Sequence, residues 1–278
     1  AGLTLGGGIV DFGTMNADGT GHITTGQFAN TSTTDNTTTI RVNLGELDEG
    51  TGASVFDTGT SVVLVNGYSG TVGTDNLVLD STDGNGVNVV QTVSQNEVDR
   101  ANLHYADGTL VSDEGTLSAQ WGLSVIELID TTEGFTIDAS GETGQSGAIT
   151  ALISGAGNAI FEAGHITIGN EDSQDENTYT GTTTVHDAVL TLAKNEALGD
   201  TSDLIVGEGT GQVDFGATQQ TFGAMHVTKE NGFTMEGGVI TLTSGESLIS
   251  GVNRDVSGEI VLSGTGVALE LNDAEAVG

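Results

Sequence analysis

The sequence has no cysteine and no proline, and it is poor in aromatic and basic residues. Without cysteine there is no disulfide, no thiolate nucleophile and no thiolate-ligated zinc site. Because proline removes a backbone donor from a β-ladder, its absence suits a fold in which strands are stacked many times. Only 4% of the 278 residues are aromatic, which suits a narrow core.

The charge is strongly one-sided. Five Lys and Arg residues stand against 39 Asp and Glu residues, which gives a formal net charge of −34. Five cations cannot neutralise a track of phosphates, so we expect no nucleic-acid partner, and an anionic membrane surface would repel the chain. No apolar run approaches the roughly 18 residues of a spanning helix, so we expect no transmembrane segment. The chain does not open on a basic stretch followed by an apolar run, so we expect no signal peptide.

Short apolar runs separated by glycine and polar turn residues are abundant. Runs rich in Val, Ile, Leu and Thr, such as 61–65, 123–129 and 189–192, have the length and composition of β-strands. The 44 glycines, together with Asn, Asp and Ser, mark the turns between them. Hydrophobic residues make up 36% of the chain, so we expect it to fold despite its charge. The sequence therefore predicts an all-β protein.

Internal repetition indicates how these strands are arranged. Gly8–Gly13 (GIVDFG) returns almost unchanged as Gly211–Gly216 (GQVDFG). In the C-terminal half we expect strand centres to step from 190 to 213, from 213 to 239 and from 239 to 261. Several short strands in each interval are typical of a parallel β-solenoid, whose inward residues form ladders as turns stack at about 4.8 Å. We predict about 12 coils.

A β-sandwich explains the pattern less well. Its hairpins favour tight-turn dipeptides such as Asn-Gly and Asp-Gly at even spacing. Such dipeptides occur at 66–67, 107–108 and 231–232, without that spacing.

One stretch carries a family pattern. Residues 177–185 (NTYTGTTTV), 190–192 (LTL) and 195–199 (NEALG) resemble the autotransporter-associated β-strand repeat of Gram-negative passenger domains. That pattern reads N-x-Y-x-G-x-T-x-V, then G-x-L-x-L, then A-L-G. Ala188 departs from it, because the family usually has glycine there, and residues 204–222 continue it more loosely.

The resemblance implies a right-handed parallel β-helix that is secreted through the outer membrane and displayed on the bacterial cell surface. Passengers of this kind are adhesins, self-associating biofilm factors or proteases. Residues 1–170 share only the strand-and-glycine composition of the family. We therefore expect 1–278 to be a single β-helix segment cut from a larger passenger.

The sharpest catalytic pattern surrounds Asp57. Residues 55–61 (VFDTGTS) resemble the D-T-G-[ST]-S turn of aspartic proteases, whose chemistry needs two carboxylates sharing one proton. No second D-T-G is present, so we expect Asp57 to lie in a strand-ending turn and the protein not to be an enzyme. The five histidines show no i, i+4 metal-binding pair. An aspartic protease using Asp57 stays as an alternative.

Two acidic turns are candidate calcium sites. Their candidate ligands are Asp80 and Asp83 in 80–86, and Asp172 and Asp175 in 171–177. Neither turn fits the EF-hand loop or the calcium-binding nonapeptide, and solvated surface loops are the better explanation of both. We therefore predict no cofactor, with calcium as the alternative.

A different kind of candidate is the stretch around Arg100, His104 and Tyr105. It interrupts the regular recurrence of glycine along the chain, and Arg and Tyr are enriched at binding hot spots. We predict interaction residues here, on a loop or hairpin that projects at about 95–118. The alternative is an ordinary coil in which Arg100 pairs with Asp99 or Glu97.

These observations predict a non-catalytic binding protein. We expect a surface-displayed passenger that adheres to a host surface or extracellular-matrix component, or that associates with itself in aggregation and biofilm formation. Long polar faces give repeated shallow contacts and hence avidity. The alternative is a structural stalk that presents another functional domain.

Overall fold

The computed structural model describes residues 1–16, 22–81, 86, 88–169, 175–207, 209–273 and 276–277. These residues form β-strands and two short 3-10 helices, η1 (Ala53–Phe56) and η2 (Thr143–Gln145). None of the helices in these ranges is long and apolar enough to span a bilayer. The stacked parallel sheets form a β-solenoid of about 11 turns, which confirms the predicted fold.

The chain divides into two compact units. The first unit contains residues 1–47, 58–92 and 103–124, and the second unit contains 48–57, 93–102 and 125–278. Four strands contribute residues to both units, namely β6 (Leu47–Asp48), β9 (Val89–Gln95), β10 (Val98–Asp113) and β11 (Thr116–Leu128).

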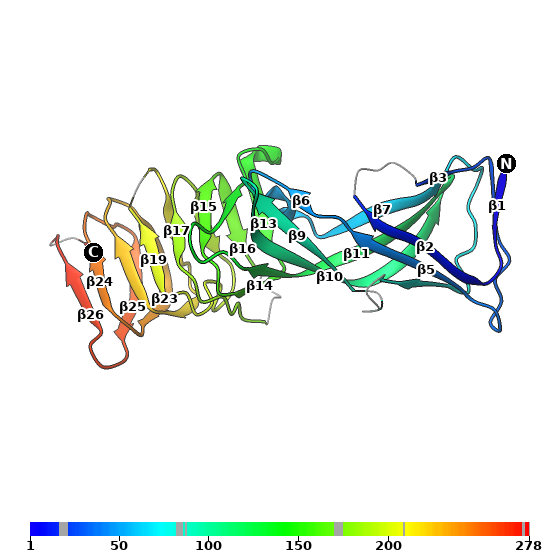
Figure 1. Ribbon diagram of the computed structural model, residues 1–278. Coiled ribbons are helices and arrows are strands. Elements are labelled where there is room, and N and C mark those ends of the chain that lie inside the picture. The colour runs from blue at the N-terminus through cyan, green and yellow to red at the C-terminus, as the bar shows by residue number, and fades with distance from the viewer. Residues whose placement is uncertain are drawn as a thin grey trace. The chain divides into compact units, whose positions relative to one another are not determined.

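The second unit contains a seven-stranded sheet in which every pairing is parallel (Figure 1). Each strand pairs with the one that lies a full turn later in the chain. In spatial order they are β12 (Phe135–Asp138), β15 (Ala159–Ala163), β17 (Thr183–Val185), β19 (Asp203–Val206), β22 (Ala224–Val227), β24 (Glu246–Ile249) and β26 (Ala268–Leu271).

The same turns contribute a second parallel sheet. Its strands are β13 (Ser146–Ile149), β16 (His165–Ile168), β18 (Val189–Leu192), β20 (Gln212–Asp214), β23 (Phe233–Leu242), β21 (Gln219–Phe222) and β25 (Val256–Leu262). Strand β23 begins beside β20 and ends beside β21, and it changes register near Gly237, whose φ of 80° is in the left-handed region.

The core of the second unit consists of ladders of inward side chains. One ladder is formed by Ile137, Phe161, Val185, Val206, Val227, Ile249 and Leu271, each paired with the next. All but Leu271 are buried. Burial of aliphatic groups contributes about 25 cal/mol per Å², so these ladders are the main source of stability.

The predicted strand steps are only partly right. Leu190 pairs with Val213, as expected. Val213 pairs with Phe233 rather than Val239, because β21 is inserted before β23 and takes the pairing with Val239. Val239 in turn pairs with Glu259, two residues before the expected partner.

The family-like stretch 177–185 forms part of one turn, and its alternation is explained by burial. Asn177, Tyr179, Gly181, Thr183 and Val185 are all buried, while the residues between them are exposed or half-buried. A Cβ on Gly181 would overlap the carbonyl oxygen of Gly157 in the preceding turn, so the position accepts only glycine.

Polar side chains within this turn bond to the turns before and after it. Asn177 Oδ1 accepts from the N–H of Ile153 at 3.0 Å, and Asn177 Nδ2 donates to the carbonyl of Ala197 at 2.7 Å. Asn253 makes the same kind of bridge between the N–H of Gly232 (2.8 Å) and the carbonyl of Ala276 (3.1 Å). These amides satisfy backbone groups that the corners leave without ladder partners.

The first unit combines parallel and antiparallel pairing. Its parallel pairs are β1 (Gly2–Leu5) with β4 (Gln27–Asn30), β2 (Gly8–Met15) with β5 (Thr38–Leu44), β5 with β8 (Leu77–Asp80), and β3 (Ile23–Thr24) with β7 (Gly59–Asn66). A further sheet contains β3, β7, β11, β10, β9 and β6, with β14 (Leu152–Gly155) beside β11.

Strand β7 runs antiparallel to β11, which departs from the all-parallel arrangement that we predicted. The hydrogen-bonded neighbours β10 and β11 are joined by a two-residue turn, and antiparallel strands need only such a short connection.

The six-residue repeat has the same local structure in both units. Asp11 Oδ1 accepts from the N–H of Gly13 at 2.8 Å, and Asp214 Oδ1 accepts from the N–H of Gly216 at 3.0 Å. Both glycines have positive φ, and the phenylalanine between Asp and Gly is buried in each copy. The repeat is therefore a strand followed by a tight corner.

Candidate functional site

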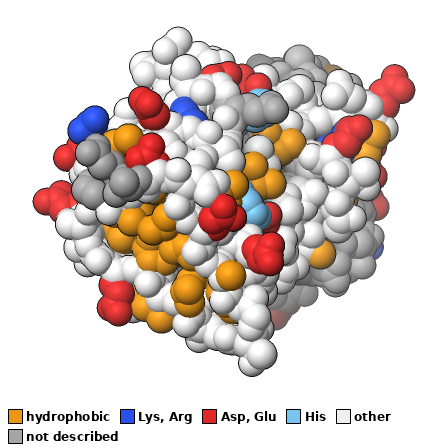
Figure 2. All heavy atoms as spheres, turned by 90° about the vertical axis from the view of Figure 1, so that its left-hand side faces the viewer, with side chains coloured by type: hydrophobic (Ala, Val, Ile, Leu, Met, Phe, Trp, Pro, Cys, Tyr) orange, Lys and Arg blue, Asp and Glu red, His pale blue; other side chains and the backbone are white. Residues whose placement is uncertain are grey.

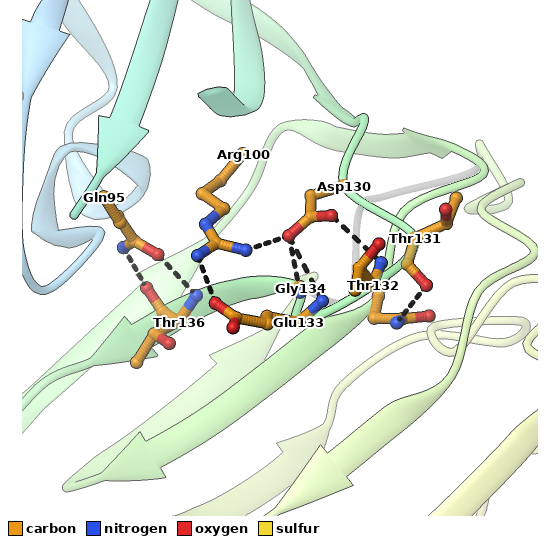
Figure 3. Close-up of polar contacts among 9 residues, drawn as sticks. Gln95, Arg100, Asp130, Thr131, Thr132, Glu133, Gly134 and Thr136 are labelled. Atoms are coloured by element: carbon orange, nitrogen blue, oxygen red, sulfur yellow. Dashed lines mark hydrogen bonds and ion pairs between the residues drawn. The ribbon is translucent and has the colours of Figure 1, made fainter. Parts of the chain in front are cut away.

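The most tightly connected polar group surrounds Arg100 in the second unit (Figure 3). Arg100 is only 4% exposed; its Nη1 donates to Asp130, and its Nη2 donates to Glu133 Oε2 at 2.6 Å. Beside it, the Gln95 amide both donates to and accepts from the backbone of Thr136, at 2.7 and 2.9 Å. These contacts fix the corner at 130–136 against β9 and β10.

Asp130 is the centre of this group. Burial raises the pKa of its carboxyl, but the backbone N–H groups of Thr132 and Gly134, together with Arg100, favour the charged form more strongly. The net result lowers the pKa of Asp130 to about 2. Both carboxylate oxygens of Asp130 accept hydrogen bonds, which holds the corner at 130–136 in place.

The three predicted interaction residues all lie on β10, but their side chains have different surroundings. Arg100 is buried with Asp130 and Glu133, and the partners that we named as the alternative, Asp99 and Glu97, are not the ones it uses. Asp99 instead accepts from Ser94 Oγ at 2.7 Å.

His104 and Tyr105 belong to the first unit. They line a cavity of about 370 Å³ with Val90, Ala106 and Ser124, among others. Tyr105 is buried, and its hydroxyl donates to Gln91 Oε1 at 3.5 Å, while His104 is half-buried. The range 95–118 contains β10 and the start of β11, so it belongs to a sheet.

The two candidate calcium ligands that the structure describes, Asp80 and Asp175, contact different residues. Asp80 accepts from Arg41 Nε at 3.3 Å, and the backbone carbonyl of exposed Asp175 accepts from Lys194 Nζ at 2.8 Å. Asp83 and Asp172 lie outside the described residues. No group of three or more His, Asp or Glu side chains in the described ranges is placed to hold a metal ion.

Asp57 is exposed at the end of the helix η1, where its N–H donates to the carbonyl of Ser54 at 3.3 Å. It thus follows a helical turn rather than the strand that we expected. Within the described part of the chain, no hydrogen bond joins its carboxyl to a second carboxyl. The arrangement of an aspartic-protease dyad is not present there.

The histidines of the second unit bridge successive turns. His226 Nδ1 contacts Asp203 Oδ1 at 2.7 Å, and His186 Nδ1 contacts Glu162 Oε2 at 3.3 Å. His165 is exposed on β16, as expected, where its Nε2 lies 2.9 Å from Thr191 Oγ1. These contacts tie neighbouring turns together and leave the histidines without a common centre.

An acidic cavity of about 580 Å³ in the second unit was not predicted. Its carboxylates are Asp214, Glu236 and Asp255, contributed by three successive turns, and Thr234 and Ser257 add hydroxyls. Asp214 Oδ1 also accepts from Thr234 Oγ1 at 3.0 Å. Carboxylates and hydroxyls suit a ligand that is rich in hydrogen-bond donors. The repeat at 211–216 draws attention to Asp214 in the sequence. The spacing of residues does not show that Glu236 and Asp255 lie beside it.

Most of the few cations make contacts inside the protein. Arg41 and Arg100 form ion pairs, Lys194 Nζ donates to Asn177 Oδ1 at 3.0 Å, and Lys229 Nζ donates to the carbonyl of Gly211 at 2.7 Å. Burial lowers the pKa of Lys194, while Asp175 raises it. The surface is consequently dominated by carboxylates.

Part of the chain is similar to a known protein. The chain is similar to the uncharacterized protein YuaQ of Escherichia coli K12, with 30% identity over 110 residues. That match covers 38% of this chain and 8% of the length of YuaQ. No protein-family model and no solved structure matches the chain.

Proposed function

We propose that this chain is a non-catalytic adhesive segment of an autotransporter passenger. It would be displayed on the bacterial cell surface and bind a host surface or extracellular-matrix component, or another cell carrying the same protein. The observation that supports this proposal most directly is the alternating burial of 177–185, since the family-like residues are the ones whose side chains point into the core.

The surface chemistry fits repeated shallow contacts. Carboxylates far outnumber cations, and four of the five cations contact other parts of the chain. Like-charged molecules repel, and salt or divalent cations weaken that repulsion within a Debye length of about 10 Å at 0.1 M. Cell–cell association through this protein should therefore strengthen as salt or calcium is added.

The direct test is binding of the 278-residue chain to an array of extracellular-matrix proteins and glycans, read in parallel with aggregation of cells that display it. Saturable binding to one class of ligand, or aggregation that depends on the displayed chain, supports adhesion. Absence of both at all salt and calcium concentrations contradicts it.

A stalk is the second candidate, and the unbroken ladders of the second unit favour it, because a solenoid with a continuous core is a stiff spacer. Replacing the second unit by an unrelated solenoid of equal length in displaying cells separates the two functions. Adhesion that survives the replacement supports the stalk, and adhesion that is lost supports a binding role for this unit.

A further inference from the structure

The chain has three Asn-Gly pairs, at 66–67, 85–86 and 231–232. In such a pair the backbone nitrogen of glycine can attack the side-chain amide of the asparagine before it, because glycine has no side chain that would hinder ring closure. Asn85 lies outside the described residues. The other two pairs have opposite surroundings, and this difference predicts which of them reacts.

The backbone nitrogen of Gly67 is not held by a hydrogen bond. Gly67 is exposed in the bend that follows β7, and its N–H donates to no other residue in the described part of the chain. Its φ of 86° lies in the left-handed region, which glycine adopts without strain. Solvent can therefore take the N–H proton, and the loss of this proton makes the nitrogen a nucleophile.

The side-chain amide of Asn66 is polarised by a neighbouring hydroxyl. Thr24 pairs with Asn66 across β3 and β7, and its Oγ1 donates to Asn66 Oδ1 at 2.7 Å. A donor at a carbonyl oxygen stabilises the negative charge that develops there when the carbon is attacked. Thr24 also lies beside Gly67, since a Cβ on Gly67 would be 3.1 Å from Thr24 Cγ2. The hydroxyl is thus next to both reacting groups.

The pair at 231–232 is protected by its hydrogen bonds. Gly232 is buried, and its N–H donates to Asn253 Oδ1 at 2.8 Å. Asn231 is tied to the next turn, because its N–H donates to the carbonyl of Val252 at 3.0 Å. A buried, hydrogen-bonded N–H reaches solvent only when the surrounding structure opens, and such openings are rare in a packed core. Asn231 should therefore persist while Asn66 reacts.

We propose that Asn66 is a site of spontaneous deamidation, promoted by the Thr24 hydroxyl and needing only water as a co-reactant. The Gly67 nitrogen forms a bond to Cγ of Asn66, the bond from Cγ to Nδ2 breaks, and ammonia leaves with the proton that the Gly67 nitrogen has lost. Water then opens the five-membered imide ring. Opening at Cγ gives aspartate, and opening at the former backbone carbonyl gives isoaspartate. This inference does not depend on the proposed adhesive function.

The reaction changes both the charge and the backbone at the end of β7. Either product adds a negative charge to a chain whose carboxylates already far outnumber its cations, and Figure 2 shows this excess on one face of the molecule. Isoaspartate also lengthens the backbone by a methylene group. It converts the Asn66 carbonyl, which accepts from the N–H of Thr25 at 2.9 Å, into a carboxylate. The pairing of β3 with β7 should therefore loosen as the protein ages.

Peptide mapping by mass spectrometry tests the proposal on the folded 278-residue chain, incubated at pH 8 in water enriched in heavy oxygen. Each ring opening incorporates oxygen from the solvent, so Asn66 should be labelled at least about tenfold faster than Asn231. In urea, where neither pair is protected, the two rates should become similar. The proposal is overturned if Asn66 is labelled no faster than Asn231 in the folded chain, or if the difference persists in urea.

Substitutions of Thr24 test the part that its hydroxyl plays. Thr24→Ala should slow the labelling of Asn66 about tenfold, and Thr24→Ser should restore the rate because serine keeps the donor. The matched control is Thr109→Ala, which removes a threonine that is also exposed in the first unit and should leave the rate unchanged. Circular dichroism checks that all variants are folded. A rate in Thr24→Ala that equals or exceeds that of the parent chain contradicts activation by the hydroxyl.

Discussion

Asn177 Nδ2 donates to the carbonyl oxygen of Ala197 at 2.7 Å, one turn further along the solenoid. The oxygen of the same amide accepts from Ile153, one turn earlier. A single side chain thus joins three consecutive turns. This relationship explains why the family-like pattern begins with asparagine, because its amide carries a donor and an acceptor on two separate atoms, and each atom reaches a different turn.

Asn177→Ala should destabilise the protein by about 3 kcal/mol, because a buried backbone donor and acceptor lose their partner together. Urea unfolding followed by circular dichroism measures the change. Thr178→Ala is the control, since Thr178 is exposed next to Asn177 and its loss should cost less than about 0.5 kcal/mol. Equal losses for the two variants would show that the amide bridge is unimportant.

Asp130→Asn should cost about 3 kcal/mol at pH 7, because it leaves the buried Arg100 without its main charged partner. Glu133→Gln is the control. Glu133 is 74% exposed, so its ion pair with the same arginine should contribute less than about 1 kcal/mol. If both variants lose the same stability, burial is not what strengthens the Asp130 contact.

Asp130 should also give the protein a specific acid sensitivity. Its pKa is about 2 in the folded protein and higher in the unfolded chain, so folding favours the charged form. The stabilisation is complete above about pH 4 and is lost as the pH falls towards 2. Unfolding free energies measured from pH 6 to 2 should therefore decline less in Asp130→Asn than in the parent chain.

Two glycine substitutions should distinguish steric overlap from backbone strain as causes of lost stability. Gly181→Ala should cost about 3 kcal/mol, because its Cβ would overlap the carbonyl of Gly157 in the preceding turn. Gly216→Ala meets no neighbour within 4 Å and only places a side chain at a φ of 53°, which costs about 1 kcal/mol. Thermal or urea unfolding should rank the two in this order, and the reverse order would contradict the close packing of turns.

Tyr179 should make the protein sensitive to alkali. Burial raises the pKa of its phenol, and the hydrogen bonds with Thr183 and Thr201 lower it by less. The unfolded chain therefore loses the proton near pH 10 while the folded chain keeps it, so stability falls as the pH rises above about 10. Tyr179→Phe should flatten this decline in unfolding measurements from pH 8 to 11, and an unchanged slope would assign it to other groups.

The solenoid was predictable from sequence because its cause is local. Inward positions repeat along each strand, and glycine and asparagine recur at the corners, so composition and spacing indicate stacked turns. The step from Leu190 to Val213 is correct because that turn has no insertion. The step to Val239 is wrong because an added strand shifts the pairing, and nothing in the spacing of apolar runs shows which sheet a strand joins.

The candidate site was less predictable because it depends on contacts between distant residues. Arg100 stands out in composition, yet Asp130 and Glu133 lie 30 and 33 residues further along. That separation does not match a turn of about 23 residues. A prediction from neighbouring residues therefore selects Asp99 as the partner of Arg100 instead. The antiparallel pairing of β7 with β11 has the same origin, since partner choice is set by the fold and not by either strand alone.

The ladder from Ile137 to Leu271 has a consequence for how such a protein can change. Its neighbouring members are separated by 21 to 24 residues, yet their side chains stay in line. The corners therefore absorb every difference in length while the packed interior is unaffected. Insertions at these corners could diversify the outer surface during evolution, and an engineer could graft foreign peptides there without redesigning the scaffold.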